Sequence, residues 1–416
     1  MKKRSIAPIP ILFSILEFIM KKRILPIIMV AVLLTGCADT PDEVRNDMSS
    51  YRDLQSSVSD ADFKFSYIKV SDLQDDAETA LEKNYGQFTV SDKIKFIQPD
   101  SVNIMEFSCI SGFIDKSKEV MSCFFPESVI ASQDIKISDN FFTFMNEKEK
   151  VYFGVEDCGF IAMLNPETFD ISFSYSEPVV KIYHTNRNDD LSDEYELNNG
   201  TCSVADAVNY INDWLYTEYK TLSPELDYIV NTVIVREHNN KYLFQFLVEG
   251  AYKGVPLDSF TRKGEIKDGM PTGKMKYIDY GIQIQMVNKK SIDSFTNLIG
   301  IFTPCIKENI DEVISLDSAL AYCEKTFTDF KNVEISDVRI MYTLSPFYSV
   351  DKEILTVEDN AKVLGYSSRP VWEIILDVPP DDFLQKDQIN TKGDVRKYIY
   401  IDMITGECYF SLDVNN

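Results

Sequence analysis

Hydrophobic positions repeat at helical spacing in two places in the second half of the chain. The first set is Val204, Ala207, Val208, Ile211 and Leu215, and the second set is Leu316, Ala319, Leu320, Cys323 and Phe327. Ser203 and Ser315 stand directly before the two periodic segments, and serine is a preferred residue at the helix N-cap. The pattern predicts two helices of the same design, each with one apolar face.

Strand-like segments follow each predicted helix. They mix β-branched, aromatic and polar residues, and they lie at 228–235, 242–248 and 277–286 after the first helix and at 338–342, 371–376 and 397–402 after the second. Such segments, separated by turn residues, are typical of antiparallel strands. The order predicts one helix packed on a three- or four-stranded antiparallel sheet, used twice, in residues 201–300 and 301–416.

The first half has a different pattern. Residues 71–74 have the form of a capping box before a helix that ends ahead of Gly86, and strands are expected at 88–90, 94–97, 151–155 and 171–175. These elements predict an α+β domain over 61–183, joined by an acidic linker at 184–200 to the repeats. The expected fold class is therefore α+β: an N-terminal α+β domain followed by two repeated helix-plus-antiparallel-sheet modules.

The N-terminal segment carries an export pattern. Three basic residues at 21–23 precede a mostly apolar run at 24–34, which is much shorter than the roughly 20 residues that span a bilayer as a helix. The following Leu34-Thr35-Gly36-Cys37 resembles the lipobox of bacterial lipoproteins. This resemblance implies that residues 1–36 are a signal peptide, with Met20 as the expected initiator, and that Cys37 is the lipidated residue. A membrane-spanning helix followed by a chance cysteine is the alternative.

Lipidation of Cys37 would place the protein at the cell membrane, on its extracytoplasmic face, with the membrane contacted through the lipid. Residues 37–60 are polar and acidic, and they are expected to form a tether. Seven cysteines remain after Cys37, an odd number without a CxxC pair, so at least one thiol should stay free. Spacing leaves open whether any of them pair, for example Cys109 with Cys123.

Composition excludes several function classes. The chain has 66 Asp and Glu against 42 Lys and Arg, a formal net charge of −24, so nucleic-acid binding is not expected. Only two histidines are present, His184 and His238, and they cannot build a multi-histidine metal cage. No catalytic residue, metal ligand or cofactor is predicted, because no motif brings a nucleophile together with a base.

An acidic loop at 186–196 resembles calcium-binding loops. With ligand positions counted from Asn186, however, Leu191 stands where glycine is needed and Leu197 where the bidentate glutamate belongs. A solvated linker fits this loop better, with calcium binding as the alternative.

The end of the chain carries a recognisable pattern. The segment Tyr398-Ile399-Tyr400-Ile401-Asp402-Met403-Ile404-Thr405-Gly406-Glu407 resembles the ending of PepSY-like modules, and a serine-capped helix precedes it as in those modules. The pattern also resembles extracytoplasmic regulators of the YycH and YycI type. The resemblance covers residues 203–416, although the first repeat lacks the Asp-x-x-Thr-Gly signature. It implies a binding or regulatory module outside the cell, and no catalytic residues carry over.

A long connection at 344–370 carries several aromatic residues. Tyr348 and Tyr366 are candidate contacts for a partner, and covering the sheet is an equal alternative. The sequence therefore predicts a membrane-anchored, non-catalytic binding or regulatory module for an envelope or membrane protein. The alternative is a solute-binding lipoprotein that holds a small ligand between its domains. A hydrolase ranks last, because only the abundance of acidic pairs such as Asp75-Asp76 supports it.

Overall fold

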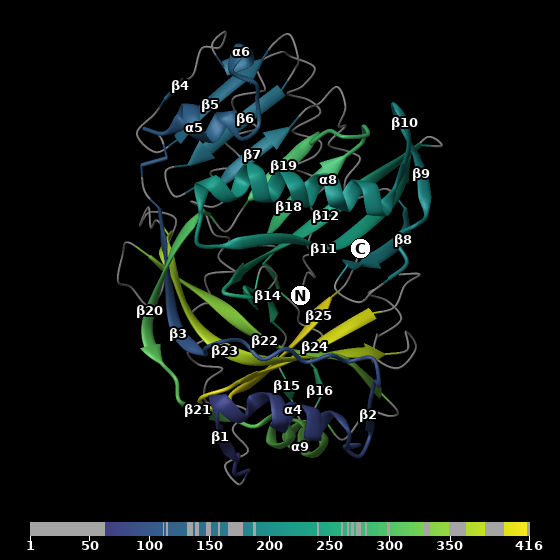
Figure 1. The fold of residues 1–416 in the computed structure, drawn as a ribbon, viewed down its shortest axis with the longest axis vertical. Coiled ribbons are helices and arrows are strands. Elements are labelled where there is room, and N and C mark those ends of the chain that lie inside the picture. Colours follow the sequence, from purple (N-terminus) through teal and green to yellow (C-terminus); the bar gives the residue numbers. More distant parts are fainter. Residues whose placement is uncertain are drawn as a thin grey trace, which may run out of the picture.

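A computed structural model describes the chain from residue 63 to residue 413 with internal gaps. The gaps are residues 111, 114, 131–135, 138–140, 147–150, 157–158, 165–177, 186–188, 239–240, 259–260, 264–265, 268–269, 272–275, 279–280, 298–299, 328–332, 349–362 and 379–394. Two large β-sheets, one above the other in Figure 1, form the described part of the molecule.

The upper sheet has ten strands, nine of them in the order β4-β5-β6-β7-β19-β18-β12-β11-β8, while β13 pairs with β12. The strands are β4 (Lys136–Ile137), β5 (Phe141–Asn146), β6 (Val151–Glu156), β7 (Ile161–Leu164), β8 (Val179–His184), β11 (Asp227–His238), β12 (Lys241–Tyr252), β13 (Val255–Pro256), β18 (Ile282–Met286) and β19 (Ser294–Asn297). All neighbouring strands are antiparallel. Side chains therefore alternate between its two faces.

The lower sheet has seven strands. Five run in the order β2-β22-β23-β24-β25, and β3 lies between β23 and β20. The strands are β2 (Phe88–Val90), β3 (Asn103–Cys109), β20 (Phe302–Asn309), β22 (Val333–Tyr348), β23 (Val363–Val378), β24 (Val395–Asp402) and β25 (Cys408–Asp413). The short pair β2 and β22 is parallel, and the other pairs in this sheet are antiparallel.

Four two-stranded pairs and the helices complete the described structure. The pairs are β1 (Tyr67–Lys69) with β21 (Glu312–Ile314), β9 (Glu194–Leu197) with β10 (Gly200–Ser203), β14 (Thr261–Lys263) with β17 (Lys276–Ile278), and β15 (Ile266–Lys267) with β16 (Met270–Pro271). The helices are η2 (Val70–Asp72), α4 (Leu73–Leu81), α5 (Ser117–Ser122), α6 (Glu127–Ile130), α8 (Val204–Thr217), η4 (Tyr219–Leu222) and α9 (Leu316–Thr326).

Each large sheet has one face covered by helices. Helix α8 lies across the upper sheet, and α4 and α9 lie side by side beneath the lower sheet (Figure 1). The predicted caps of the two long helices are confirmed: the Ser203 hydroxyl accepts a hydrogen bond from the Asp206 amide at 3.0 Å, and the Ser315 hydroxyl accepts one from the Ser318 amide at 3.1 Å. The predicted capping box at 71–74 is wrong, because the N-cap residue Asp72 makes no side-chain cap, and the Gln74 amide of α4 donates instead to Oε1 of Gln98 at 2.9 Å.

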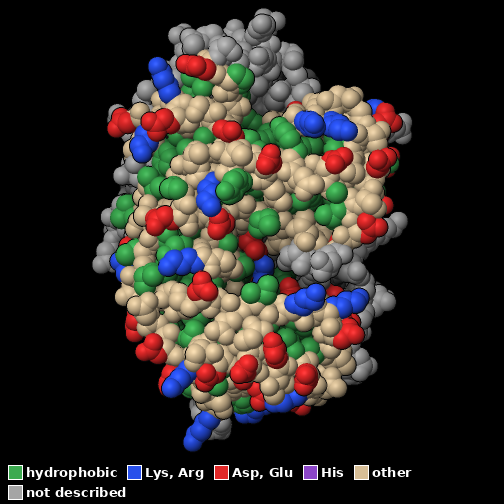
Figure 2. Space-filling view, viewed as in Figure 1, with side chains coloured by type: hydrophobic (Ala, Val, Ile, Leu, Met, Phe, Trp, Pro, Cys, Tyr) green, Lys and Arg blue, Asp and Glu red, His purple; other side chains and the backbone are tan. Residues whose placement is uncertain are grey.

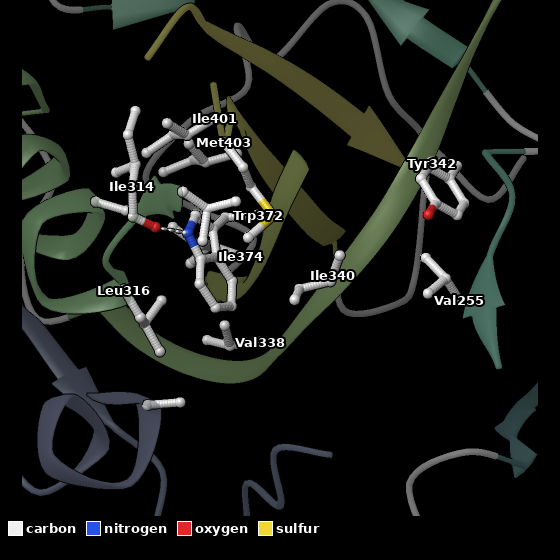
Figure 3. Close-up of a cluster of buried hydrophobic side chains, with 14 of the residues drawn as sticks. Val255, Ile314, Leu316, Val338, Ile340, Tyr342, Trp372, Ile374, Ile401 and Met403 are labelled. Carbon is white, nitrogen blue, oxygen red and sulfur yellow. Dashed lines mark hydrogen bonds between the residues drawn. The ribbon is translucent and has the colours of Figure 1, made fainter. Parts of the chain in front are cut away.

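The lower core is centred on Trp372 of β23, which is fully buried. Its indole Nε1 donates a hydrogen bond to the Ile314 carbonyl at 2.8 Å, which satisfies the one polar atom of this side chain (Figure 3). Leu316 of α9 and Ile374 of β23 pack in the same cluster. The apolar face of α9 therefore meets the lower face of this sheet, as its periodicity predicts.

The predicted fold class is wrong. The described chain is mostly β-structure, and its helices do not belong to separate helix-plus-sheet modules. Strands do follow both α8 and α9 in antiparallel order, but each set is extended by strands from the first half of the chain: β7 pairs with β19, and β3 pairs with β20 and β23. The local hydrophobic pattern predicts a helix and the strands that follow it. It does not predict which distant strand pairs with the edge of each sheet.

The segment predicted as an N-terminal domain, residues 61–183, is divided between the sheets. Its strands β2 and β3 belong to the lower sheet, and its strands from β4 to β8 belong to the upper one. The predicted strands at 88–90 and 151–155 are confirmed as β2 and β6, whereas residues 94–97 form no strand. The predicted strand at 171–175 lies outside the described residues.

Candidate functional site

The lipidation site predicted at Cys37 lies outside the described residues, together with the predicted signal peptide at 1–36 and most of the tether at 37–60. Within the described part of the chain, no helix is both long enough and apolar enough to cross a membrane. The six cysteines that the structure describes, Cys109, Cys123, Cys202, Cys305, Cys323 and Cys408, are all free thiols.

The aromatic connection predicted at 344–370 is largely strand. Strands β22 and β23 pair as far as Tyr348 opposite Val363, and residues 349–362 lie outside the described structure. Tyr366 is only 3% exposed, and its ring centroid lies 5.1 Å from that of Phe302. Tyr366 therefore lies in the lower core, in line with the alternative that these aromatic residues cover the sheet, and the side chain of Tyr348 lies outside the described structure.

The carboxylates of the acidic loop between β8 and β9 accept hydrogen bonds from neighbouring residues. The Asp189 carboxylate accepts from the His184 amide at 2.7 Å, and Asp193 accepts from the Lys181 ammonium at 2.7 Å. The hydrogen bond from Lys181 is the largest cause of the lowered pKa of Asp193. No group of three or more potential metal-ligating acids, histidines or cysteines occurs within the described residues.

The Asp-x-x-Thr-Gly motif near the end of the chain forms a tight turn between β24 and β25. The Asp402 carboxylate accepts hydrogen bonds from the amides of Ile404 and Thr405, both at 2.8 Å. Gly406 has φ of +76°, and a Cβ added there would lie 2.2 Å from Cε2 of Phe65. The motif residues thus have a structural explanation in the turn itself.

The residues weighed for catalysis also have structural contacts. Nδ1 of His184 lies 3.2 Å from the hydroxyl of Thr232. The Asp76 carboxylate of α4 accepts a hydrogen bond from the Leu316 amide at 2.7 Å, at the N-terminus of α9. Asp76 therefore caps the N-terminus of a neighbouring helix.

The two faces of the upper sheet differ in polarity. The row of Val233, Phe246, Ile284 and Phe295, paired across four strands, lies on the face covered by α8 and is fully buried. The adjacent row on the opposite face pairs Gln245 with Gln285, and these side chains are 3% and 6% exposed. Burial of a side-chain amide costs free energy unless the amide is hydrogen-bonded. The hydrogen-bond partners of Gln245 and Gln285 therefore show whether this cost is offset.

A connected set of polar side chains lies on this second face. Nε of Arg236 donates to Oε1 of Gln245 at 3.1 Å, and Nε2 of Gln245 donates to Oε1 of Gln283 at 3.2 Å. Oε1 of Gln285 is buried and has no hydrogen-bond partner among the described residues. We call Arg236, Gln245, Gln283 and Gln285 the glutamine cluster.

A second polar set lies further along β12, on the same face, and joins the two sheets. The Arg339 guanidinium of β22 binds both carboxylate oxygens of Glu249, with Nη2 at 2.7 Å from Oε2 and Nη1 at 3.1 Å from Oε1. Its Nε donates to Glu373, the residue opposite Arg339 on β23, and Asn231 donates to Glu249 at 2.9 Å. We call these four residues the inter-sheet cluster.

The inter-sheet cluster holds two carboxylates against one guanidinium. Burial raises the pKa of Glu249, against the opposing effect of Arg339. Burial alone would lower the pKa of Arg339, but Glu249 and Glu373 outweigh it and hold this pKa well above its usual value. Figure 2 shows acidic and basic side chains close together near the middle of the visible face, between the upper and lower halves.

Sequence reasoning missed both clusters. The alternation of glutamine with apolar residues at 282–286 is a signal for a strand with one polar face, and it was available in the sequence. The approach of Glu249 to Arg339 had no such signal, because 90 residues separate them in the chain.

The comparisons add little to this geometry. No family model matches the chain, and no curated protein matches it. Among solved structures, the crystal structure of an uncharacterized protein from Eubacterium rectale ATCC 33656 is similar, with 14% sequence identity and a TM-score of 0.45, covering 78% of this chain and 90% of that chain. A likeness this distant carries no argument about function.

Proposed function

We propose that this protein is an extracytoplasmic, lipid-anchored binding protein that acts without catalysis. The lipobox-like Leu34-Thr35-Gly36-Cys37 supports the anchor on Cys37 and a location at the cell membrane. The local hydrogen bonds of Asp76 and His184 support a structural role for residues weighed for catalysis, and that of Asp193 supports a structural role in the acidic loop.

The geometry favours capture of a solute on the polar face of the upper sheet. The observation that carries this proposal is the glutamine cluster, in which buried amides line a sheet face where apolar side chains would otherwise pack. Small-molecule sites combine a mostly apolar surround with a few placed polar groups.

A thermal unfolding screen of the secreted Cys37→Ala protein tests solute capture. A ligand that binds only the folded state stabilises it by about 2.7 kcal/mol at 100 times its Kd, which is measurable as a rise in Tm. We expect a rise with at least one neutral polar solute. No change across sugars, short peptides and amino acids would refute solute capture.

The second candidate is a regulatory contact with an envelope or membrane protein, as the resemblance to PepSY-like and YycH or YycI modules implies. Strand β8 favours it: among the described residues β8 pairs only with β11, and its Val180 is 44% exposed. An open edge strand can accept a strand from another protein.

In-cell crosslinking with native Cys37 and with Cys37→Ala tests this candidate. One dominant membrane partner that is lost in the Cys37→Ala protein and weakened by Val180→Lys is the expected result. An unchanged crosslinking pattern in Val180→Lys would exclude β8 as the contact.

A further inference from the structure

We propose that the inter-sheet cluster is a proton-binding site, and that the bound proton strengthens the contact between the two sheets. This inference is independent of solute capture, because it concerns only the place where the sheets meet. It stands on the charges that this buried contact brings together: the carboxylates of Glu249 and Glu373 and the guanidinium of Arg339.

The two sheets meet where the hairpin of β12 and β13 reaches β22. The Asp258 amide, just after β13, donates to the Tyr342 carbonyl of β22 at 2.8 Å, and Leu257 forms a bridge with Tyr342. Val255 of β13 also lies near Tyr342 (Figure 3). These backbone and apolar contacts do not titrate, whereas the contact that Arg339 of β22 makes with β12 carries charge.

The charges in this contact do not balance when both carboxylates are ionised. Arg339 binds both oxygens of Glu249, with N–O distances of 2.7 and 3.1 Å, and its Nε donates to Glu373. Glu249 and Glu373 are 8% and 1% exposed, so water screens neither carboxylate well. Two carboxylates against one guanidinium leave one buried negative charge, which is unfavourable, and the binding of one proton removes it.

Glu249 is the carboxylate that takes the proton. Its pKa is raised from 4.5 chiefly by burial, with ionised Glu373 adding to the effect and Arg339 opposing it. If the sheets separate at this point, water reaches Glu249 and its pKa returns toward the ordinary value. The closed contact therefore binds the proton more tightly than the open one does. Its stabilisation is fully present below the ordinary pKa and is lost as the pH rises through the folded-state pKa.

Other titratable or charged residues lie on the elements around the cluster. They are Asp227 and Arg236 of β11, Asp258 after β13, Asp337 of β22 and Tyr400 of β24. Asp258 is the one to separate from Glu249 by experiment, because it is 5% exposed and its amide belongs to the same contact between the sheets.

Amide hydrogen exchange of the secreted Cys37→Ala protein between pH 4 and pH 8 tests the proposal. After correction for the intrinsic pH dependence of exchange, the Asp258 amide reports opening of the contact, and the Glu218 amide at the end of α8 is the internal control. The variant is Glu249→Gln, which cannot bind the proton. Glu106→Gln is the matched control, because its carboxylate binds Lys307 at 2.7 Å away from the inter-sheet cluster.

We expect the opening constant of the Asp258 amide to rise above pH 4.5, by up to about tenfold per pH unit as linkage to one proton requires, and the Glu218 amide to show no such rise. The slope should vanish in Glu249→Gln and remain in Glu106→Gln. A flat profile in the parent protein would overturn the proposal. A slope that persists in Glu249→Gln would also overturn it, because the proton would then bind another group such as Asp258. If Glu249→Gln does not fold, Glu373→Gln should flatten the slope by leaving one carboxylate against the guanidinium, and an unchanged slope there would overturn the proposal.

Discussion

Replacement of Arg339 by methionine should destabilise the protein strongly, because this side chain holds two buried carboxylates between the two sheets. Arg339→Met keeps much of the apolar stem but leaves Glu249 and Glu373, which are 8% and 1% exposed, without their cation. Removing one partner of a buried ion pair costs about 3–5 kcal/mol. Because 20% of the Arg339 side chain is exposed, the lower end of that range applies, about 3 kcal/mol.

Urea denaturation followed by fluorescence gives this free energy directly. A loss of about 3 kcal/mol corresponds to a change of roughly 100-fold in the unfolding equilibrium constant. The matched control is Arg369→Met, because the Arg369 side chain is 46% exposed and its Nη1 lies 3.6 Å from Asp402, so its loss should cost less than about 1 kcal/mol. Equal losses in the two variants would refute the assignment of a buried cluster.

The pH dependence gives an independent check on the same cluster. The pKa of Glu249 is raised in the folded state, mainly by burial. Protonated Glu249 therefore favours folding: its contribution to the free energy of unfolding is fully present below the unfolded-state pKa, and it is lost as the pH rises through the folded-state pKa. Without Arg339 this pKa should rise further. The deficit of Arg339→Met should therefore be smaller at pH 5 than at pH 8, and the added substitutions Glu249→Gln and Glu373→Gln should restore most of the loss at pH 8.

Three other changes test local features. Gly406→Ala should destabilise the protein more than Gly254→Ala. Both glycines have positive φ, but only a Cβ at position 406 would collide with a side chain, that of Phe65. Equal Tm values for the two variants would exclude this steric contribution. Ser315→Ala should cost about 0.5–2 kcal/mol through loss of a helix cap, measured by urea denaturation, and no change would show that the cap is replaced. The pKa of Asp317 is lowered in the folded state, with the hydrogen bond from Lys83 as the largest cause. Ionised Asp317 therefore stabilises the fold above its unfolded-state pKa, and this stabilisation is lost as the pH falls through the folded-state pKa. Asp317→Asn should therefore reduce stability at pH 7 by under about 1 kcal/mol and make little difference at pH 3, and an equal loss at both values would contradict the ion pair.

Local patterns in the sequence predicted local structure well. The periodic apolar residues after Ser203 and Ser315 become α8 and α9 with both caps in place, and the strands expected at 242–248 and 371–376 lie within β12 and β23. These predictions succeed because helix faces and strand alternation depend on residues that are neighbours in the chain.

Pairing between distant segments could not be predicted in the same way. Tyr366 was expected in a connection, with partner contact and sheet covering as equal alternatives. It is a core residue of β23, because β22 and β23 pair much further than the turn residues near 346 suggest. The inter-sheet cluster likewise depends on how β12 meets β22, which no local pattern encodes. Predictions about Cys37 remain predictions, since that residue lies outside the described structure.

The interleaving of early and late strands has a consequence for how the protein reaches its folded state. Strand β3, near residue 105, pairs with β20 and with residues 365–368 of β23, and β7 near residue 162 pairs with β19 near residue 295. Neither sheet can form completely until distant parts of the chain have been synthesised. Folding is therefore expected to be slow, as it is for proteins dominated by long-range contacts. During synthesis, β3 and β7 therefore stay unpaired on these edges until residues 294–309 and 365–368 have been made.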